Sequence, residues 1–301
     1  MEIRTLRYFL AVAREGNMTR AAGGLHVTQP TLSKALRALE DELGKRLFTR
    51  HSFSISLTEE GALLRDRAEN LLLMVDKIEQ EFLSLDEVMG GDLYLGLAES
   101  YQIRYLAREI KRLKDRYPDL RYHITSGDTE QVTEGLDKGL LDFAVLCGLP
   151  NERKYEHLLF PEADYFGLVM RKDDCLAGRE GIRVGDLVGL PLFCSKQSWE
   201  GDIRPWAKER FGELRLEGSF RLAYNGSVFV KEGLGYLLAL DGLVDTSSES
   251  GLVFRPLSPA LEVPLCLAWG RRQTLTPIAK RFLDQLRAVF AACGREDHFA
   301  P

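Results

Sequence analysis

Residues 18–44 read MTRAAGGLHVTQPTLSKALRALEDELG, and their pattern indicates how the first part of the chain folds. A short helix is predicted over 18–25, and the chain then turns before Thr28, whose hydroxyl is a natural helix N-cap. Pro30 falls in the first turn of the second helix, where its missing N–H costs nothing. Two short helices joined by a tight turn are what a helix-turn-helix needs, and its second helix enters the major groove of duplex DNA.

The outer face of this second helix carries side chains suited to a DNA groove. Leucines recur along its inner face, and Ser33, Lys34 and Arg37 are expected on the opposite face. Gln29 can pair with adenine, while Lys34 and Arg37 can reach guanine edges or phosphates. Patterning alone leaves a solvated face of a helical bundle as the alternative. The residues predicted to contact DNA, two of them from a following hairpin, are Thr28, Gln29, Pro30, Thr31, Ser33, Lys34, Arg37, Arg50 and His51.

Periodic segments and an uneven charge distribution surround this pair of helices. Apolar residues at helical spacing predict a helix over 3–14, and the alternation around Ile55 and Leu57 predicts a small β-hairpin, or wing. Residues 1–57 carry nine Lys or Arg and five Asp or Glu, a net +4, whereas the rest carries 31 against 40, a net −9 that completes the overall −5. Residues 1–57, the head, are thus basic, whereas the rest of the chain, the body, is acidic. This asymmetry indicates that the head binds a polyanion.

The segment from Phe9 to Arg50, together with LTEEG at 57–61, resembles the N-terminal domain of the LysR-type transcriptional regulators. Many residues match that family's pattern at fixed spacing, which argues strongly against the helical-bundle alternative. One departure concerns the wing, because Phe53 and Ser54 stand where many members carry arginine, and this predicts weaker phosphate contacts. The matching residues are Ala21, Ala22, Leu25, Gln29, Pro30, Ser33, Leu39, Glu40, Leu43, Gly44, Leu47, Phe48, Arg50, Leu57, Thr58 and Gly61.

Residues 59–89 form a long periodic segment between the head and the body. Apolar residues repeat every seven positions, with a second row four positions later, which is the seam of a two-stranded coiled coil. The alternative is a helix packed on its own domain, but dimerisation is favoured because paired recognition helices read two half-sites. The resemblance implies the same linker helix and often a tetramer made from two dimers. The predicted dimerisation residues are Leu64, Leu71, Val75, Ile78, Phe82 and Leu85.

From Asp92 onward strands and helices alternate, which predicts a parallel sheet in an α/β domain. A second α/β unit follows, and the chain crosses between the two lobes near 161–164 and 262–267, which leaves a cleft between them. The expected strands are 93–98, 121–127, 143–148, 165–170, 191–195, 219–223, 235–240 and 263–270, and the expected helices are 102–116, 130–138, 199–210, 227–232 and 275–291.

The predicted fold is multidomain, with an all-α winged helix-turn-helix N-terminal domain, a long coiled-coil linker helix and an α/β two-lobed effector domain. The resemblance implies that the effector domain is similar to type 2 periplasmic binding proteins, and looser local matches such as Tyr117-Pro118-Asp119 support it. The expected boundaries are 1–58 for the DNA-binding domain, 59–91 for the linker helix and 92–301 for the effector domain, with lobe I over 92–162 and 267–301 and lobe II over 163–266.

Polar residues follow several predicted strands, at the edge where open α/β sheets bind ligands. Ser126 to Thr129 open a helix whose free N–H groups can hold a carboxylate, so an organic acid is one candidate effector. The resemblance implies that Ser100 and Thr129 face the effector, whereas Glu99 would repel a simple carboxylate unless it points outward or pairs with Lys196. Each position has an ordinary helix cap or turn as its alternative. The predicted effector-binding residues are Ser100, Thr129, Glu99, Tyr101, Ser126, Ser195 and Asn225.

Motifs of common enzyme classes are missing from the sequence, which has no G-x-S-x-G elbow, no Walker loop and no H-E-x-x-H. We therefore expect no catalytic residues, no metal site and no cofactor. Five scattered cysteines fit a reducing compartment, and the lack of a signal-peptide pattern or a long apolar run predicts a cytoplasmic protein rather than a secreted solute-binding protein. Some family members sense peroxide through two cysteines, so a redox role for Cys175 and Cys194 stays open beside the commoner buried structural thiol.

We therefore predict a LysR-type DNA-binding transcriptional regulator that binds promoter DNA as a homodimer or homotetramer. A small-molecule effector in the cleft would shift the two lobes and reorient the paired heads. The expected partners are double-stranded promoter DNA, the effector, further copies of the chain and RNA polymerase, with no membrane. The identity of the effector, the target genes, the choice between activation and repression, and the choice between dimer and tetramer stay open.

Overall fold

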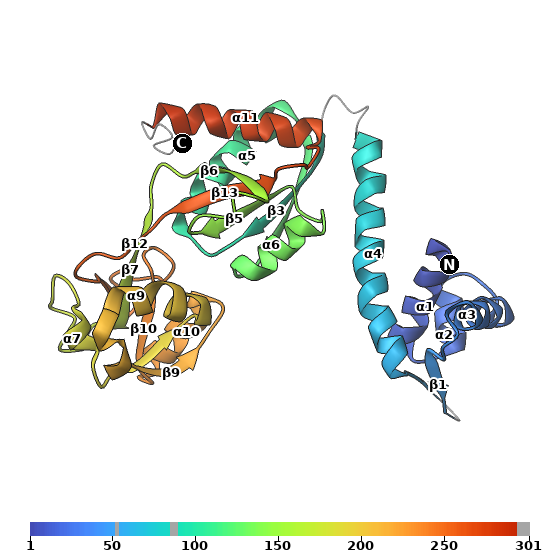
Figure 1. Ribbon diagram of the computed structural model, residues 1–301, viewed down its shortest axis with the longest axis horizontal. Helices are drawn as coiled ribbons and strands as arrows, with labels where there is room; N and C mark the ends of the chain where they lie inside the picture. The colour runs from blue at the N-terminus through green and yellow to red at the C-terminus, as the bar shows by residue number, and fades with distance from the viewer. Residues whose placement is uncertain (52–53, 85–89, 294–301) are drawn as a thin grey trace. The chain divides into compact units, whose positions relative to one another are not determined.

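The computed structural model describes residues 1–51, 54–84 and 90–293 and divides the chain into two compact units, Met1–Leu83 and Ser84–Pro301 (Figure 1). The wing tip at Phe53 and the predicted dimerisation residue Leu85 lie outside the described residues. No helix of the described residues is long and apolar enough to cross a membrane.

The first unit is a winged helix-turn-helix followed by a long helix, as predicted. Gly16 and Gly44 adopt left-handed backbone conformations, φ 58° and 64°, and end the first and third helices, a role that glycine fills without steric cost. Phe9, Leu32 and Leu39 are fully buried at the centre of its core. The elements are α1 (Ile3–Glu15), α2 (Met18–Gly24), α3 (Gln29–Leu43), the antiparallel hairpin β1 (Phe48–Arg50) and β2 (Ile55–Leu57), and α4 (Glu59–Ser84).

Two motif residues fix the wing against the helices. The buried Glu40 carboxylate accepts the backbone N–H of Leu47 at 2.8 Å and pairs with Arg46 at 3.0 Å. A Cβ on Gly61 would lie 2.1 Å from the Leu47 carbonyl oxygen, so α4 packs against this segment only with glycine there. The match between these residues and the motif therefore has a packing reason.

The predicted seam of α4 divides into two parts. Ala68 is buried and Leu64 packs against the core of the head, so the alternative of a helix packed on its own domain holds for this end. Further along, Leu71, Ile78 and Phe82 are 39%, 45% and 68% exposed. They are spaced by seven and four residues, so they share one face of the helix. Only the later part of the seam is therefore free for a partner.

The first lobe of the second unit is a five-stranded sheet in the order β4-β3-β5-β13-β6. Its first three strands are parallel as predicted, whereas β13 runs antiparallel to β5 and β6. Core contacts place α5 and α11 on one face of the sheet and α6 on the other (Figure 1). The elements are β3 (Gly90–Leu97), η1 (Tyr101–Ile103), α5 (Arg104–Arg116), β4 (Asp119–Ser126), α6 (Thr129–Asp137), β5 (Phe143–Cys147), β6 (Tyr155–Leu159), β13 (Leu265–Gly270) and α11 (Pro277–Ala292).

The second lobe is a six-stranded mixed sheet in the order β11-β7-β10-β8-β9, with β12 paired to β7. The elements are β7 (Asp164–Arg171), α7 (Val184–Leu187), β8 (Pro191–Cys194), α8 (Lys196–Ser198), η2 (Trp199–Ile203), α9 (Arg204–Ala207), η3 (Lys208–Glu213), β9 (Arg215–Ser219), α10 (Ala223–Lys231), β10 (Tyr236–Leu240), β11 (Leu252–Pro256) and β12 (Glu262–Val263).

Three expectations for this lobe were wrong. The strand predicted over 219–223 lies earlier, at β9, because Ala223 already begins α10. The helix predicted over 199–210 is broken into π, α and 3₁₀ turns. The return crossing runs from β12 to β13, and because β13 starts at Leu265, Leu265 and Cys266 belong to the first lobe instead of the second.

Candidate nucleic-acid interface and ligand cleft

The N-terminus of α3 presents a slim polar surface. The Thr28 hydroxyl caps the helix and lies 2.8 Å from the Thr31 hydroxyl. Thr28, Gln29, Pro30 and Thr31 are all exposed. Because this cap is uncharged, it leaves the positive end of the helix dipole available to an anion.

Two cations extend this surface along α3. Lys34 and Arg37 are exposed, and neither forms an ion pair with a described residue. By contrast, Arg46 pairs with Glu40 at 3.0 Å and Arg7 pairs with Asp76 at 2.7 Å. The charges on the outer face of α3 are therefore free to meet phosphates.

The other predicted DNA-contacting residues have different surroundings. Ser33 is only 9% exposed, so its expected outward position is wrong. It lies three and seven residues before Leu36 and Glu40, which are both buried, and helical periodicity puts it beside them. His51 is exposed on the wing, with Nε2 3.0 Å from the Ser56 hydroxyl. Arg50 ends β1, and its side chain is outside the described part of the chain.

A cavity of about 1140 Å³ lies between the two lobes of the second unit. The first lobe contributes the residues after β3, β4 and β5, and the second lobe contributes the residues after β8 and β9 together with part of β10. This is the carboxyl edge of the strands at which a ligand was expected. The charged lining residues are Glu99, Asp128, Glu130, Lys196 and Arg221.

The structure brings four of the seven predicted effector-binding residues to this cavity, namely Glu99, Ser126, Thr129 and Ser195. The other three lie outside its lining. Ser100 is buried, and its hydroxyl accepts the N–H of Gln102 at 2.9 Å. The Tyr101 ring is exposed with the Arg104 guanidinium 4.7 Å from its centroid, and Asn225 is exposed on α10.

Hydrogen bonds cross this cavity from one lobe to the other. The Glu99 carboxylate accepts the N–H of Ala223, the first residue of α10, at 2.7 Å. The amide of Gln197 accepts the Thr129 N–H at 3.1 Å and donates to the Thr129 hydroxyl at 2.9 Å. The suggested pairing of Glu99 with Lys196 is wrong, because the carboxylate accepts an N–H of α10 and no ion pair joins these two side chains among the described residues.

Three carboxyl groups that are wholly or partly removed from water act on the lining of the cavity. Burial raises the pKa of Glu99 and of Asp202. Burial, with the neighbouring Asp241 carboxylate, raises the pKa of Asp164 to about 6. Cys147 lines the cavity, and burial together with the charges of Asp164, Asp202 and Glu99 raises the pKa of its thiol to about 12.

The sequence did not single out Glu130, Cys147 or Arg221 as lining residues. Arg221 was missed because 219–223 was taken for a strand, whereas it precedes α10. Cys147 could have been found, since it ends a predicted strand at the ligand-binding edge.

Among the thiols of the proposed redox pair, Cys175 is exposed, while burial raises the pKa of Cys194 and makes it a poor nucleophile.

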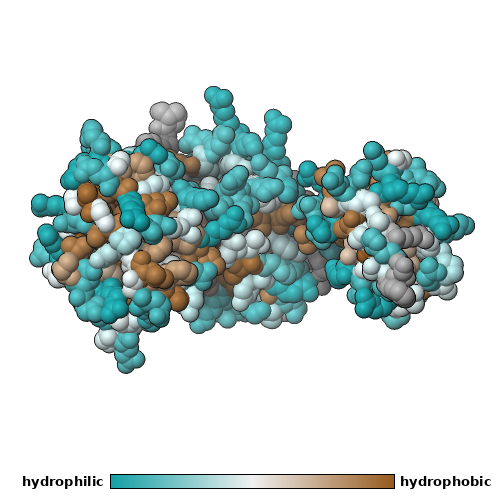
Figure 2. Space-filling model, turned by 90° about the horizontal axis from the view of Figure 1, so that it is seen from below, coloured by the Kyte–Doolittle hydropathy of each residue, from teal (hydrophilic) through white to brown (hydrophobic). Residues whose placement is uncertain are grey.

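Exposed apolar side chains mark two further surfaces of the second unit. Tyr224, Val228 and Phe229 project from α10, and Tyr122 and Ile124 lie on the edge strand β4. Figure 2 shows hydrophobic side chains gathered over the lobe that contains β9 and α10. Exposed patches of this kind commonly mark protein–protein contacts, and an unpaired strand edge is open to pairing.

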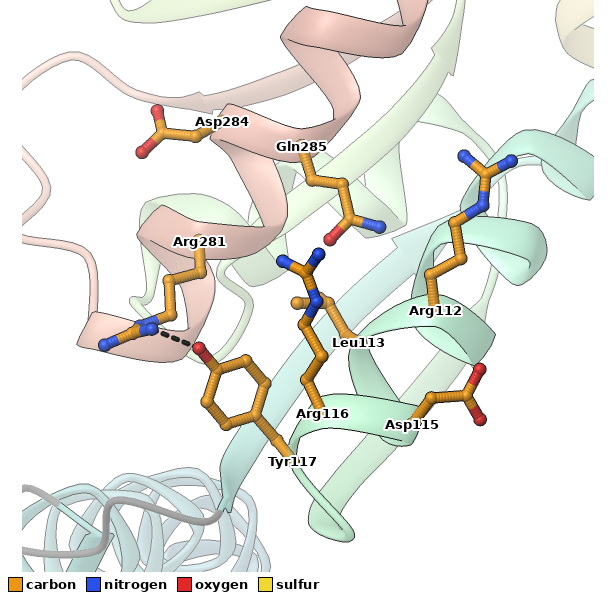
Figure 3. Close-up of a pocket in the computed structure, with 8 residues that line it drawn as sticks. All are labelled: Arg112, Leu113, Asp115, Arg116, Tyr117, Arg281, Asp284 and Gln285. Carbon is orange, nitrogen blue, oxygen red and sulfur yellow. Dashed lines mark hydrogen bonds between the residues drawn. The ribbon is translucent and has the colours of Figure 1, made fainter.

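A second cavity of about 660 Å³ lies between α5 and α11 (Figure 3). Arg112 and Arg116 reach it from α5, and Arg281 from α11 donates to the Tyr117 hydroxyl. Asp115 and Asp284 stand at its margin, and Leu113 and Gln285 complete the lining. Its charge is thus opposite in sign to that of the cleft between the lobes, where carboxylates outnumber cations.

Two family profiles match the chain. The profile described as "Bacterial regulatory helix-turn-helix protein, lysR family" matches residues 3–62, and that described as "LysR substrate binding domain" matches residues 87–291. The chain is 30% identical over 302 residues to the Hca operon transcriptional activator HcaR of Escherichia coli (strain K12), an alignment that covers 94% of this chain and 96% of that protein.

A further relative aligns with only part of the chain, and solved structures superpose on nearly all of it. The hydrogen peroxide-inducible genes activator of Pectobacterium carotovorum is 35% identical over 194 residues, an alignment that covers 64% of this chain and 64% of that protein, less than two thirds of its length. The crystal structure of CbnR, a LysR family transcriptional regulator, superposes with a TM-score of 0.76 at 21% identity and covers 96% of this chain and 99% of that one. CbnR complexed with its target DNA gives a TM-score of 0.74 at 22% identity, with coverage of 96% and 99%.

Proposed function

Because the chain belongs to the LysR family of DNA-binding transcriptional regulators, we propose that α3 is its DNA-recognition helix and that the cleft between its two lobes binds the effector. The assignment of α3 as the recognition helix rests on its exposed N-terminus, at which no charged group of the described residues neutralises the helix dipole. Its cap is uncharged, and Lys34 and Arg37 on the same helix have no ion-pair partner among the described residues. Such a surface attracts phosphates and can read base edges in the major groove.

Self-association through α4 would place two recognition helices on one DNA. Leu71, Ile78 and Phe82 form an exposed apolar row, and a second copy of α4 is the occupant that fits a row with this spacing. Burying the three side chains against a copy would contribute roughly 25 cal/mol per Å² of apolar surface. We propose a dimer with half-sites about one helical turn of DNA apart, or a multiple of it.

A tetramer needs a second surface, and the second unit offers one. The apolar side chains of α10 and the edge strand β4 are exposed on the same unit, and contact between these surfaces of two copies would cover both. We propose that dimers joined through α4 assemble further through these surfaces.

RNA polymerase is the proposed downstream partner, and the cytoplasm is the proposed location.

Binding of a ligand in the cleft is the proposed signal. Its lining comes from both lobes, and hydrogen bonds from Glu99 and Thr129 already cross it, so a ligand there changes the contacts that hold the lobes together. An effector shifts an oligomer only as far as its affinities for two arrangements differ. No enzymatic step is part of this proposal, and the bound small molecule acts as a signal, not as a substrate.

The recognition helix is tested by DNA binding. Lys34→Ala and Arg37→Ala should each weaken binding to the gene's own upstream region in a gel shift by about tenfold or more, because each removes a base or phosphate contact. Lys111→Ala, an exposed lysine on α5, makes the same charge change in the other unit and should bind like wild type. Wild-type affinity in both α3 variants would refute the assignment.

The dimer is tested on the face of α4. Leu71→Asp combined with Ile78→Asp should at least halve the mass measured by light scattering, because buried aspartates would face each other across the seam. Leu73→Asp is the matched control, since Leu73 is exposed on α4 but lies two residues from Leu71, on the opposite side of the helix. An unchanged mass in the double variant would contradict dimerisation through this face.

A further inference from the structure

The helix N-termini that line the cleft are occupied by the chain's own acceptors. At α6, Asp128 caps the helix by accepting the Gln131 N–H at 3.0 Å, and the Thr129 N–H donates to Gln197 at 3.1 Å. At α10, the first N–H donates to the Glu99 carboxylate at 2.7 Å. A carboxylate ligand would therefore have to displace groups already in place, two of which are themselves negatively charged.

The charged side chains of the lining are unbalanced. Three carboxylates, Glu99, Asp128 and Glu130, face two cations, Lys196 and Arg221. Both cations are exposed, and neither forms an ion pair with a described residue. Glu99 is half-buried, and only its Oε2 accepts a hydrogen bond from a described residue. Its charge is thus not neutralised by a cation of the described chain.

A fully buried acid acts on the same part of the cleft lining. Asp164 is 0% exposed, the Ser100 and Gln102 side chains are its polar neighbours, and no Lys or Arg of the described residues forms an ion pair with it. Its charge acts on the Cys147 thiol, which lines the cleft, and the charges of Asp202 and Glu99 act on the same thiol. Three carboxyl groups therefore lie close enough to act on one thiol of the cleft lining, and carboxylates removed from water without a countercharge are costly.

We infer that the effector carries a protonated amine and that this nitrogen binds the Glu99 carboxylate at the base of the cleft. Oε2 keeps its bond from the Ala223 N–H, and Oε1 accepts the ammonium group in a charge-assisted hydrogen bond. The ligand thereby supplies the countercharge that the described chain lacks. If the effector also carries a carboxylate, Lys196 and Arg221 are the cations of the lining that can pair with it.

This inference rests on the proposed function and narrows the ligand class, since an organic acid was the sequence-based candidate. It depends on the charge of Glu99 and not on its hydrogen bond to α10. A glutamine at this position keeps an acceptor for the Ala223 N–H and removes only the negative charge. Glu99→Gln therefore separates the effect of the negative charge from the effect of the hydrogen bond to α10.

The test uses the full-length protein and small probes matched in skeleton but opposite in charge. Benzylamine and putrescine should raise the melting temperature in a saturable way and give binding isotherms, whereas benzoate and succinate at the same concentration should not. Phenylalanine distinguishes a zwitterionic effector, because its carboxylate can reach the lining cations, and it should bind more tightly than benzylamine only if those cations take part. Glu99→Gln should weaken amine binding by about tenfold or more.

Glu134→Gln is the matched control, because Glu134 is an exposed residue of α6 that pairs with Lys138 at 2.7 Å and does not line the cleft. Amine binding that survives Glu99→Gln, stabilisation by the carboxylates alone, or no response to any probe would each overturn the inference. DNA binding by the wild-type protein is measured in parallel. Its loss would refute the proposed function, whereas DNA binding without amine binding would refute the ligand class alone.

Discussion

The N-termini of α3 and α10 both belong to proposed binding surfaces, yet they offer opposite surfaces to a ligand. The Thr31 N–H of α3 is capped by the neutral Thr28 of the preceding turn, and Lys34 and Arg37 follow on the same helix without an ion-pair partner among the described residues. The first N–H of α10 is capped by Glu99, a carboxylate that lies 124 residues away in the sequence and comes from the other lobe. The same helix dipole is thus available to phosphates in one unit and already neutralised in the other.

This difference teaches that a helix N-terminus attracts an anion only when its cap is neutral. The dipole contributes a partial charge of about half a unit at each helix end, which a single carboxylate outweighs. Exchanging the charge of the cap between the two sites should therefore exchange their preferences for anions.

Thr28→Asp should convert the N-terminus of α3 into a carboxylate-capped one. Aspartate is a good N-cap, so the melting temperature should stay near that of the wild type, but DNA affinity should fall by about tenfold or more because the new charge faces phosphates. Fluorescence anisotropy with the gene's upstream region measures the change. Thr28→Ser keeps a neutral cap and should bind normally, and undiminished affinity in Thr28→Asp would mean that this end of α3 is not at the DNA backbone.

Asp164→Asn should stabilise the protein at high pH, by about 2 kcal/mol at pH 8. The folded state raises the pKa of Asp164 from 3.8 to about 6, so it holds the proton more tightly than the unfolded chain does. The stability linked to that proton is complete below pH 3.8 and lost as the pH rises through about 6. Asparagine has no charge to bury at any pH, so the variant does not lose this stability as the pH rises. The difference in unfolding free energy between variant and wild type should therefore disappear toward pH 4.

Urea unfolding at pH 8, 6 and 4 measures this gain, with Asp284→Asn, an exposed residue of α11, as the control. A destabilised Asp164→Asn at pH 8 would mean that a cation already neutralises Asp164. The base of the cleft would then not be short of positive charge, and the contrast with α3 would weaken.

Glu99→Gln should make the N-terminus of α10 more like that of α3. The capping hydrogen bond to the Ala223 N–H can remain while the charge is removed, so benzoate, which should give no isotherm with the wild type at the probe concentration, should bind the variant more tightly, by about three- to tenfold relative to the wild-type detection limit. Calorimetric titration of wild type and variant with benzoate measures the gain. If the affinity for benzoate does not change, the charge of the cap is not what separates the two helix ends.

Gln197→Ala should have the smallest effect on stability, a loss of less than about 1 kcal/mol, because its two hydrogen bonds to Thr129 are solvent-exposed. It frees the Thr129 N–H, so hydrogen exchange at the start of α6 should become faster. Lys196→Ala, at the adjacent exposed position, should leave that exchange unchanged. Equal protection in all three proteins would show that the cross-lobe pair does not hold the lobes together.

Much of the head could be predicted from its sequence because its signals are local. Thr28, Pro30 and the glycines that end α1 and α3 lie within a few residues of the groups they cap, and the winged helix-turn-helix follows from them. Ser33 is the exception, since the sequence pattern placed it outside and the packing of Leu36 and Glu40 places it inside. The seam of α4 was found as a pattern, but its division into packed and exposed parts depends on the head against which it lies.

The sequence by itself determined the family motif, the order of most helices and strands, and the cleft edge where Glu99, Thr129 and Ser195 lie, because periodicity, caps and strand ends are properties of neighbouring residues. Only the tertiary structure decided how the cleft is charged. The Glu99 carboxylate reaches α10 from 124 residues away, and Gln197 reaches Thr129 from 68 residues away. No local pattern records such contacts, because they exist only once the two lobes have folded against each other.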